Sequence, residues 1–536
     1  ARRIAVRVEG VVQGVGFRPF VHRLATELGL AGLVYNDVAG VWLEVEGRRD
    51  AVDAFLDRLG AEAPPASAVE RVTVHARRPR GDAGFAILPS PPGGEGDVPV
   101  SPDLAACAAC LAEMRDPGDR RHRYPFVTCT DCGPRFSIIA SVPYDRPRTT
   151  MAGFTMCPAC QAEYDDPGDR RFHAQPNGCP ACGPQARLVD ASGAEAPGDP
   201  VRAAAGLLRD GAIVAIKGLG GYHLACRADD ADAVAGLRAR KHREHKPFAL
   251  MVGDAADAAG LVDLCAVGRD LLASPARPIV LAPRADGAAV APAVAPGMRE
   301  LGVMLAYTPL HALLFDDLAQ LGAAPVALVM TSGNLSDEPI AYRDDDALAR
   351  LTAVADAFLV HDRPIRTRTD DSVARVVAHP DGPRVMVLRR SRGYVPAALP
   401  LPVPAPRPLL AAGAEQKNTF CVVRGARAWM GPHIGDLEHA ETHAAYHEGI
   451  AHFEGLFAVA PRAVAHDLHP EYLSTKAALE RPDVDAHAVQ HHHAHLVACL
   501  AEHGGDGAAV GAVFDGTGLG PDGTIWGGEI LVGDAG

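Results

Sequence analysis

The stretch Cys107-Ala-Ala-Cys110, joined by an 18-residue gap to Cys129-Thr-Asp-Cys132, occurs twice in this chain. It returns fifty residues later as Cys157-Pro-Ala-Cys160 and Cys179-Pro-Ala-Cys182, again with 18 residues between the pairs. The intervening segment Asp116-Pro-Gly-Asp-Arg-Arg121 recurs with the same shift. Self-similarity at a fixed period indicates a duplicated structural unit, here with four cysteines in each copy.

The cysteine spacing predicts metal binding. Two cysteines separated by two residues can turn both sulfurs toward one point, and two such pairs complete the tetrahedral thiolate set that suits Zn²⁺. Disulfides and redox-active pairs are the alternatives, but neither needs the duplication. Because four thiolates close the coordination sphere, we expect two structural zinc ions, with the chemistry on either side of them. Sharing within one copy is the simplest grouping, although the spacing leaves other pairings open: Cys107, Cys110, Cys129 and Cys132; then Cys157, Cys160, Cys179 and Cys182.

Length and composition limit the rest of the chain. With 536 residues it is too long for one core, so we expect three or four domains. A formal net charge of −14 argues against wrapping of long nucleic acid. No apolar run reaches membrane-spanning length and no signal-peptide pattern is found, which predicts a cytoplasmic protein without a membrane partner. The cysteines outside the repeat are expected to be buried small hydrophobic residues: Cys226, Cys265, Cys421 and Cys499.

Residues 1–90 have the pattern of a small α/β sandwich. Ile4, Val6 and Val8 alternate with polar residues, as in a half-buried strand. The predicted order is strand, helix, hairpin, helix, strand, over 4–8, 20–28, 33–36 with 41–45, 51–59 and 69–75. This βαββαβ order predicts a ferredoxin-like fold. A linker rich in proline and glycine follows at 89–99.

The loop after the first strand predicts an anion site. Its backbone amides and the start of a helix can hold phosphate, and the arginine adds a bidentate ligand; the residues are Gly14, Val15, Gly16, Phe17 and Arg18. With Gly32-Leu-Val-Tyr-Asn36, this segment resembles acylphosphatase. In that family the arginine holds the acyl phosphate and the asparagine orients the attacking water. The resemblance therefore implies catalytic roles for Arg18 and Asn36; a helix start with a surface arginine is the alternative.

Residues 195–395 suggest a nucleotide site. A buried strand at 213–216 runs into Lys217 and Gly218, which alone is a weak phosphate signal. A cationic run at 238–246 strengthens it, although such a run is often only a solvated face. Short polar donors follow another apolar segment at 326–330. A triphosphate and its leaving pyrophosphate need such groups, and the candidates are Lys241, Arg243, Lys246, Thr331, Ser332 and Asn334.

This region resembles the YrdC-type nucleotide-binding domain, in the form found in HypF-type carbamoyltransferases. The matching stretches include Lys217-Gly-Leu-Gly-Gly221, Gly302 to His311, Met330 to Ile340 and Arg389-Arg-Ser-Arg-Gly-Tyr394. The family's Lys-x-Arg and Ser/Thr-x-Asn elements fall on Lys241-His-Arg243 and Ser332-Gly-Asn334. The resemblance implies that ATP, with Mg²⁺, adenylates a carbamate-like carboxylate and releases pyrophosphate, with Arg389 among the binding residues.

Residues 405–536 follow a stiff proline-rich linker at 402–408. His491 and His495 are four apart, so on a helix they share a face and can hold one metal ion, whereas His492 and His493 would point elsewhere. The pattern resembles the His-x-x-x-His metal motif of TsaD-type proteins. Asp515 and Gly516 resemble a phosphate loop of the same actin-like ATPase fold. The family's domain runs further and supplies a third metal ligand, so we expect only part of that domain here.

The order of these parts resembles HypF-type proteins over essentially the whole chain. We expect an α/β multidomain protein: acylphosphatase-like (1–90), duplicated zinc finger (100–190), YrdC-like (195–395) and partial TsaD-like (405–536). The resemblance implies hydrolysis of carbamoyl phosphate, activation of the carbamate with ATP as carbamoyl-adenylate, and transfer to the C-terminal cysteine of a HypE-type acceptor in [NiFe] hydrogenase maturation. A tRNA-modifying threonylcarbamoyl enzyme, a small-molecule O-carbamoyltransferase and a zinc-dependent chaperone-like module remain as alternatives.

Overall fold

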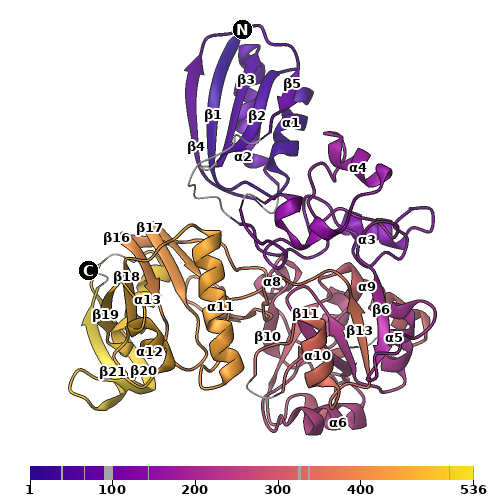
Figure 1. The fold of residues 1–536 in the computed structure, drawn as a ribbon, viewed down its shortest axis with the longest axis vertical. Coiled ribbons are helices and arrows are strands. Elements are labelled where there is room, and N and C mark those ends of the chain that lie inside the picture. Colours follow the sequence, from indigo (N-terminus) through magenta and orange to yellow (C-terminus); the bar gives the residue numbers. More distant parts are fainter. Residues whose placement is uncertain are drawn as a thin grey trace. The chain divides into compact units, whose positions relative to one another are not determined.

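The computed structural model in Figure 1 describes residues 1–37, 40–64, 67–89, 100–142, 144–323, 327–335, 338–505 and 507–534. The predicted linker at 89–99 lies outside the described residues except for its first residue. The chain forms two compact units, and the second begins at Val395. Among the described helices, none combines the length and the apolar character that crossing a membrane would require.

The N-terminal part has the predicted ferredoxin-like order. Its elements are β1 (Arg2–Val11), α1 (Phe17–Glu27), β2 (Ala31–Asp37), β3 (Gly40–Gly47), α2 (Arg49–Ala61), β4 (Ala68–Arg77) and β5 (Phe85–Ile87). The sheet order is β4-β1-β3-β2-β5, so a short fifth strand that the pattern did not predict extends it. Ile4, Val6 and Val8 are fully buried, as their alternation requires. Helix α1 begins at Phe17, three residues before the predicted start, because Gly16 caps it in a left-handed conformation.

The two copies of the cysteine repeat fold alike and are joined to each other by ion pairs. In each copy a short helix starts directly after the first cysteine: α3 (Ala108–Arg115) and α4 (Pro158–Asp165). Arg121 of the first copy pairs with Glu163 of the second, and Arg171 of the second pairs with Glu113 of the first. The two 3₁₀ turns η1 (Arg146–Arg148) and η2 (Thr150–Gly153) lie in the connection between the copies. The repeat in the sequence is therefore a repeat in the contacts as well.

The third part is built on a ten-stranded sheet. Its strands are β6 (Ala186–Asp190), β7 (Val214–Lys217), β8 (Tyr222–Arg227), β9 (Ala249–Val252), β10 (Ile279–Pro283), β11 (Glu300–Leu305), β12 (Leu328–Ser332), β13 (Ala357–His361), β14 (Val373–Val377) and β15 (Arg384–Arg389). Their order is β15-β14-β10-β11-β9-β12-β8-β7-β13-β6. The helices are α5 (Pro200–Arg209), α6 (Ala231–Lys241), α7 (Ala255–Ala259), α8 (Ala266–Ala273), α9 (Pro309–Gln320) and α10 (Asp344–Leu351), with the turn η3 (Pro292–Val294).

Two hydrophobic cores contain the sheet residues, and one of them includes the first cysteine copy. Met114, Tyr124 and Phe126 share that core with Leu310 and Leu314 of α9. Outside the core, Arg123 pairs with the buried Asp317, also on α9. The first copy is therefore part of the packing of the third domain and not a free appendage.

The second unit contains a four-stranded sheet of order β17-β16-β18-β19 and a separate hairpin, β20-β21. Its elements are β16 (Leu399–Ala411), β17 (Cys421–Met430), α11 (Ala440–Leu456), β18 (Ala463–Asp467), α12 (Leu473–Leu479), β19 (Asp485–Val489), α13 (His491–Glu502), β20 (Ala509–Leu519) and β21 (Ile525–Gly533).

Two predictions are wrong here. The proline-rich stretch 402–408 is not a linker, because it lies inside β16. It stays extended since proline fixes φ near the value of an extended chain. The ladder to β17 shifts register between Pro400 and Ala405 and again between Ala405 and Leu409, two intervals whose prolines lack amide donors. Cys265, the N-cap residue of α8, and Cys499, on the solvent-facing side of α13, are exposed and not buried. Cys421 is half-buried, whereas Cys226 is buried as predicted.

Candidate functional site

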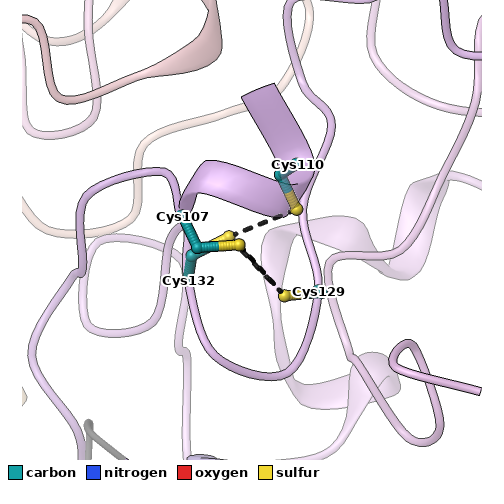
Figure 2. Close-up of side chains that lie close together, drawn as sticks. All are labelled: Cys107, Cys110, Cys129 and Cys132. Carbon is teal, nitrogen blue, oxygen red and sulfur yellow. Dashed lines mark hydrogen bonds between the residues drawn. The ribbon is translucent and has the colours of Figure 1, made fainter. Parts of the chain in front are cut away.

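The eight repeat cysteines form two clusters, each within one copy. Figure 2 shows the first, in which the Sγ atoms of Cys107, Cys110, Cys129 and Cys132 converge. The Sγ–Sγ distance is 3.5 Å from Cys132 to Cys110 and 3.7 Å from Cys107 to Cys129. The S–S bond of a disulfide is about 2.05 Å long, which is much shorter than these distances. Four sulfurs that each lie about 2.3 Å from one zinc ion are separated from one another by about the distances observed here. The geometry fits a tetrahedral metal site and settles the grouping that the spacing left open.

Arginines from the opposite copy approach each thiolate cluster. Arg170 of the second copy places Nη2 3.3 Å from the Sγ of Cys110, and Arg120 of the first copy places Nη2 3.3 Å from the Sγ of Cys160. Four thiolates around one divalent ion carry a net negative charge, which these guanidinium groups offset. Each cluster therefore depends on the other copy for its charge balance.

The phosphate loop lies in a pocket that the cysteine unit covers. The pocket is partly open to solvent and has an empty volume of about 360 Å³. It is lined by Gly14, Gly16, Phe17, Arg18 and Asn36 from the N-terminal domain, and by Thr130, Arg135, Tyr144 and 172–176 from the cysteine unit. Gly14 and Gly16 both have positive φ, 71° and 77°. A Cβ at Gly16 would lie 3.0 Å from the carboxylate of Asp131. Glycine is thus required both by the backbone conformation and by the close approach of the cover.

Two polar groups in this pocket have no protein partner among the described residues. Asn36 is buried, and its Oδ1 accepts no hydrogen bond. The guanidinium of Arg18, for which the described part of the chain also provides no hydrogen bond, is half-buried. Burial lowers the pKa of Arg18, although Asp145 and Tyr164 act in the opposite direction. Uncommitted donors and acceptors in a desolvated pocket are what a phosphate and a water molecule need.

The loop carbonyl of Gly14 is fixed from the cysteine unit. Arg135 donates from Nε to the oxygen of Gly14 at 2.9 Å. Its other nitrogens bind the carbonyl oxygens of Cys132 at 2.7 Å and Thr130 at 2.8 Å, both in the second cysteine pair of the first copy. One buried side chain therefore joins the loop at Gly14 to the second cysteine pair of the first copy.

A second candidate site joins α6 to the end of β12. Lys241 is buried, and its Nζ donates to the carbonyl oxygen of Ser332 at 2.7 Å and to Oδ1 of Asn334 at 2.5 Å. Ser332 Oγ donates to the same Oδ1 at 2.8 Å. The structure thus brings together Lys241 and the segment 331–334, which are about ninety residues apart in the chain.

Other predicted nucleotide residues lie elsewhere. Arg243 donates to the carbonyl oxygens of Lys246 and Pro247 and lies against the ring of Phe248. Arg389 ends the edge strand β15, with β14, β10, β11 and β9 between it and β12. Arg389 is therefore not part of the Lys241 cluster, because the strand order separates residues that only the sequence resemblance had grouped.

Lys217 and Gly218 line a third pocket, together with Tyr307, His361 and Arg363. Lys217 Nζ donates to the carbonyl oxygen of His361 at 2.9 Å and pairs with Asp344 at 2.5 Å. The Tyr307 hydroxyl and Nδ1 of His361 are buried without a partner among the described residues. Unpaired buried polar atoms around a lysine favour a site for a small polar ligand.

The histidines of α13 meet an aspartate. The Nε2 atoms of His491 and His495 are 3.2 Å apart, and both face Oδ2 of Asp515, at 2.8 and 3.1 Å. Nδ1 of His491 donates a hydrogen bond to Oδ2 of Asp467 at 2.6 Å, which orients the ring and raises the pKa of His491. Two imidazoles and a carboxylate on one point are a suitable ligand set for a transition metal. His492 and His493 bond to backbone carbonyls instead, as expected.

Family models match four consecutive parts of the chain. They are an acylphosphatase (residues 4–87), a HypF finger (106–139 and 156–189), a model of Sua5, YciO and YrdC proteins described as telomere recombination (206–391) and a HypF Kae1-like domain (404–502). Carbamoyltransferase HypF2 of Cupriavidus necator is 49% identical and aligns with 100% of this chain and 68% of its own length. This chain belongs to the HypF carbamoyltransferase family.

Other HypF proteins agree. Carbamoyltransferase HypF of Rhodobacter capsulatus is 51% identical over 99% of this chain and 70% of its own length. A crystal structure of full-length HypF in a phosphate- and nucleotide-bound form superposes with a TM-score of 0.93 at 43% identity, covering 99% of this chain and 69% of that one. The crystal structure of T. kodakarensis HypF superposes with a TM-score of 0.88 at 39% identity, covering 99% of this chain and 68% of that one. The predicted fold class is confirmed, and the protein is a carbamoyltransferase with an acylphosphatase-like domain.

Sequence reasoning missed three residues of the HypF sites described above. Arg135 and His173 line the phosphate pocket from the cysteine unit, but no local pattern distinguishes them from other surface residues. Asp515 was assigned to a phosphate loop, yet its carboxylate faces two histidines. Asp515 therefore provides a third candidate ligand within this chain. A search for an acidic residue after an apolar strand, near a His-x-x-x-His helix, could have found it.

Proposed function

We propose that the phosphate pocket hydrolyses carbamoyl phosphate, and that the chain then activates the product with ATP. The uncommitted Arg18 and Asn36, closed in under a cover, are the observation that carries this proposal. The guanidinium binds the phosphoryl oxygens, and Oδ1 of Asn36 accepts a hydrogen bond from the attacking water. Water adds to phosphorus, the P–O bond to the carbamoyl group breaks, and phosphate and carbamate are formed.

Activation requires ATP, because carbamate is a poor electrophile. The cluster of Lys241, Ser332 and Asn334, with Thr331 beside it, is the proposed site for the triphosphate and its Mg²⁺. The carbamate oxygen attacks the α-phosphorus, pyrophosphate leaves, and carbamoyl-adenylate results. The crystal structure of the HypF relative was determined with phosphate and nucleotide bound, which supports the same two ligands here.

The last step proposed is transfer to a protein thiol. A C-terminal cysteine thiolate of a HypE-type acceptor attacks the carbamoyl carbon, and AMP leaves. The group at His491, His495 and Asp515 would hold a metal ion, and the two cysteine clusters would hold structural Zn²⁺. Eight reduced thiolates fit a reducing compartment, so we place the protein in the cytoplasm.

The test is exchange of radiolabelled pyrophosphate into ATP. Exchange that depends on carbamoyl phosphate is expected in the wild type and absent in Arg18→Ala, with Arg49→Ala, an exposed arginine of α2, as the control. Ammonium carbamate at high concentration should restore exchange in Arg18→Ala, because it bypasses hydrolysis. Undiminished exchange in Arg18→Ala with carbamoyl phosphate would contradict the order of steps. Exchange driven by threonine and bicarbonate would instead indicate a threonylcarbamoyl enzyme.

A further inference from the structure

The two copies of the cysteine repeat present the same loop to two different pockets. Residues 125–128 of the first copy line the pocket of Lys217, and residues 172–176 of the second copy line the pocket of Arg18. Arg123 and His173 occupy the same position of the two loops, fifty residues apart, and both have positive φ, 57° and 53°. Arg123 is committed to the carboxylate of Asp317, at 2.8 Å. His173 faces a substrate pocket, so the duplicated position has two different tasks.

The side chains that cover the phosphate pocket are mostly committed to other protein groups. Tyr144 donates to the oxygen of Pro134 at 3.1 Å, and Thr130 donates to the oxygen of Arg170 at 3.1 Å. Gln175 accepts from the hydroxyl of Tyr164 at 2.9 Å and donates to the oxygen of His173 at 2.9 Å. Within the described part of the chain, the imidazole of His173 has no such bond. It is the polar group of the cover that remains available to a ligand.

The ring of His173 is nevertheless held in place. It stacks on the ring of Tyr164, with centroids 5.0 Å apart and an interplanar angle of 12°, and it contacts the ring of Phe172 at 4.3 Å. The hydroxyl of Tyr164 is itself fixed by Gln175. A ring that is positioned by packing but not bonded at its nitrogens is preorganised for a ligand.

The imidazole is neutral at physiological pH. Burial lowers the pKa of His173 to about 4, and the nearby charge of Arg18 acts in the same direction, whereas the carboxylates of Asp145 and Asp165 oppose it. A neutral imidazole has one N–H donor and one nitrogen lone pair that accepts. Next to a guanidinium and the donor-rich phosphate loop, that lone pair adds an acceptor to the cover.

Carbamoyl phosphate, the substrate in the proposed function on which this inference rests, has a phosphate end and an amide end. The loop and Arg18 match the phosphate end, and the N–H groups of the amide need an acceptor. We propose that His173 recognises the carbamoyl end of the substrate by accepting a hydrogen bond from its amide nitrogen. The residue determines specificity: an acyl phosphate that has a methyl group in place of the amide leaves the same lone pair unpaired.

The test compares two substrates in the whole protein. His173→Phe keeps a ring against Tyr164 and removes the acceptor. We expect kcat/KM for hydrolysis of carbamoyl phosphate to fall by about 10- to 100-fold, and kcat/KM for acetyl phosphate to change by less than about threefold. His173→Asn, which tolerates positive φ and provides a carbonyl acceptor, should recover part of the preference for carbamoyl phosphate. His122→Phe is the matched control, because His122 is exposed and the equivalent residue of the second copy is already Phe172.

The outcomes distinguish substrate recognition by His173 from a role in packing or in general acid–base catalysis. Equal losses with both substrates in the Phe variant would overturn the proposal, because they indicate packing or general acid–base action. Failure of His173→Asn to recover any preference would also count against it. If the Phe variant loses its metal content and does not fold, the substrate ratio of His173→Asn decides. A wild type that hydrolyses acetyl phosphate but not carbamoyl phosphate would refute the proposed function itself. Equal losses with both substrates in the variants would refute only the role of His173 and would not affect the proposed function.

Discussion

Nε of Arg135 lies 2.9 Å from the carbonyl oxygen of Gly14, so a residue of the cysteine unit fixes the loop that is proposed to bind phosphate. We predict that Arg135→Met lowers kcat/KM for carbamoyl phosphate hydrolysis by about tenfold or more, although Arg135 need not touch the reacting atoms. The methionine fills the space but removes the donor of the carbonyl oxygens of Gly14 and Thr130, at a cost of about 1–3 kcal/mol for each unsatisfied group. Steady-state kinetics and thermal unfolding measure the two effects.

The control for Arg135 is Arg148→Met, since Arg148 is an exposed arginine of the same unit. A variant Arg135→Met that is less stable but hydrolyses carbamoyl phosphate at the wild-type rate would show that the Gly14 contact has no role in positioning the loop.

The metal clusters should act on the same loop. We predict that Cys129→Ser retains one of the two thiolate-bound zinc ions and loses hydrolysis along with pyrophosphate exchange. Structural zinc contributes about 10 kcal/mol or more to folding of its site, and the carbonyl oxygen of Thr130, next to Cys129, is a partner of Arg135. Metal analysis of the purified protein gives the stoichiometry, and Cys265→Ser, an exposed cysteine, is the control. Two thiolate-bound zinc ions in Cys129→Ser would refute the four-thiolate assignment.

The sequence predicts well what depends on local spacing. The cysteine repeat predicted both clusters, and the loop ending at Arg18 predicted a helix start, because pairs of cysteines and glycine-bearing turns act over a few residues. It predicts poorly what depends on distant contacts. Arg135 meets Gly14 across 121 positions, and His173 enters the pocket only when the second copy covers the first domain. The prolines of β16 were misinterpreted for a related reason, since strand pairing decides whether an extended proline segment is a linker.

The Lys241 cluster separates the second reaction from the first. We predict that Lys241→Met abolishes pyrophosphate exchange and leaves hydrolysis of carbamoyl phosphate within about twofold of the wild type. Lys241 binds the backbone and side chain of the 332–334 turn, so its removal displaces that turn and takes away the Nζ donor of the Ser332 carbonyl oxygen. Lys476→Met, an exposed lysine of α12, is the control. Equal loss of both activities would mean that Lys241 supports the whole fold and not the nucleotide site.

The site of His491, His495 and Asp515 should bind one metal ion beyond the two zinc ions of the cysteine clusters. The three ligand atoms lie within 4.8 Å of one another, and Asp467 orients His491. We predict that His495→Ala and Asp515→Asn each weaken binding of a transition metal by at least about tenfold, and that Asp467→Asn weakens it by about 10- to 100-fold through the orientation of the ring. Equilibrium dialysis with Zn²⁺ or Mn²⁺ measures the affinity. His493→Ala is the control, because His493 faces a backbone carbonyl on the other side of the helix. If Asp515→Asn binds the ion as tightly as the wild type, the carboxylate is not a ligand, and its earlier assignment to a phosphate loop regains weight.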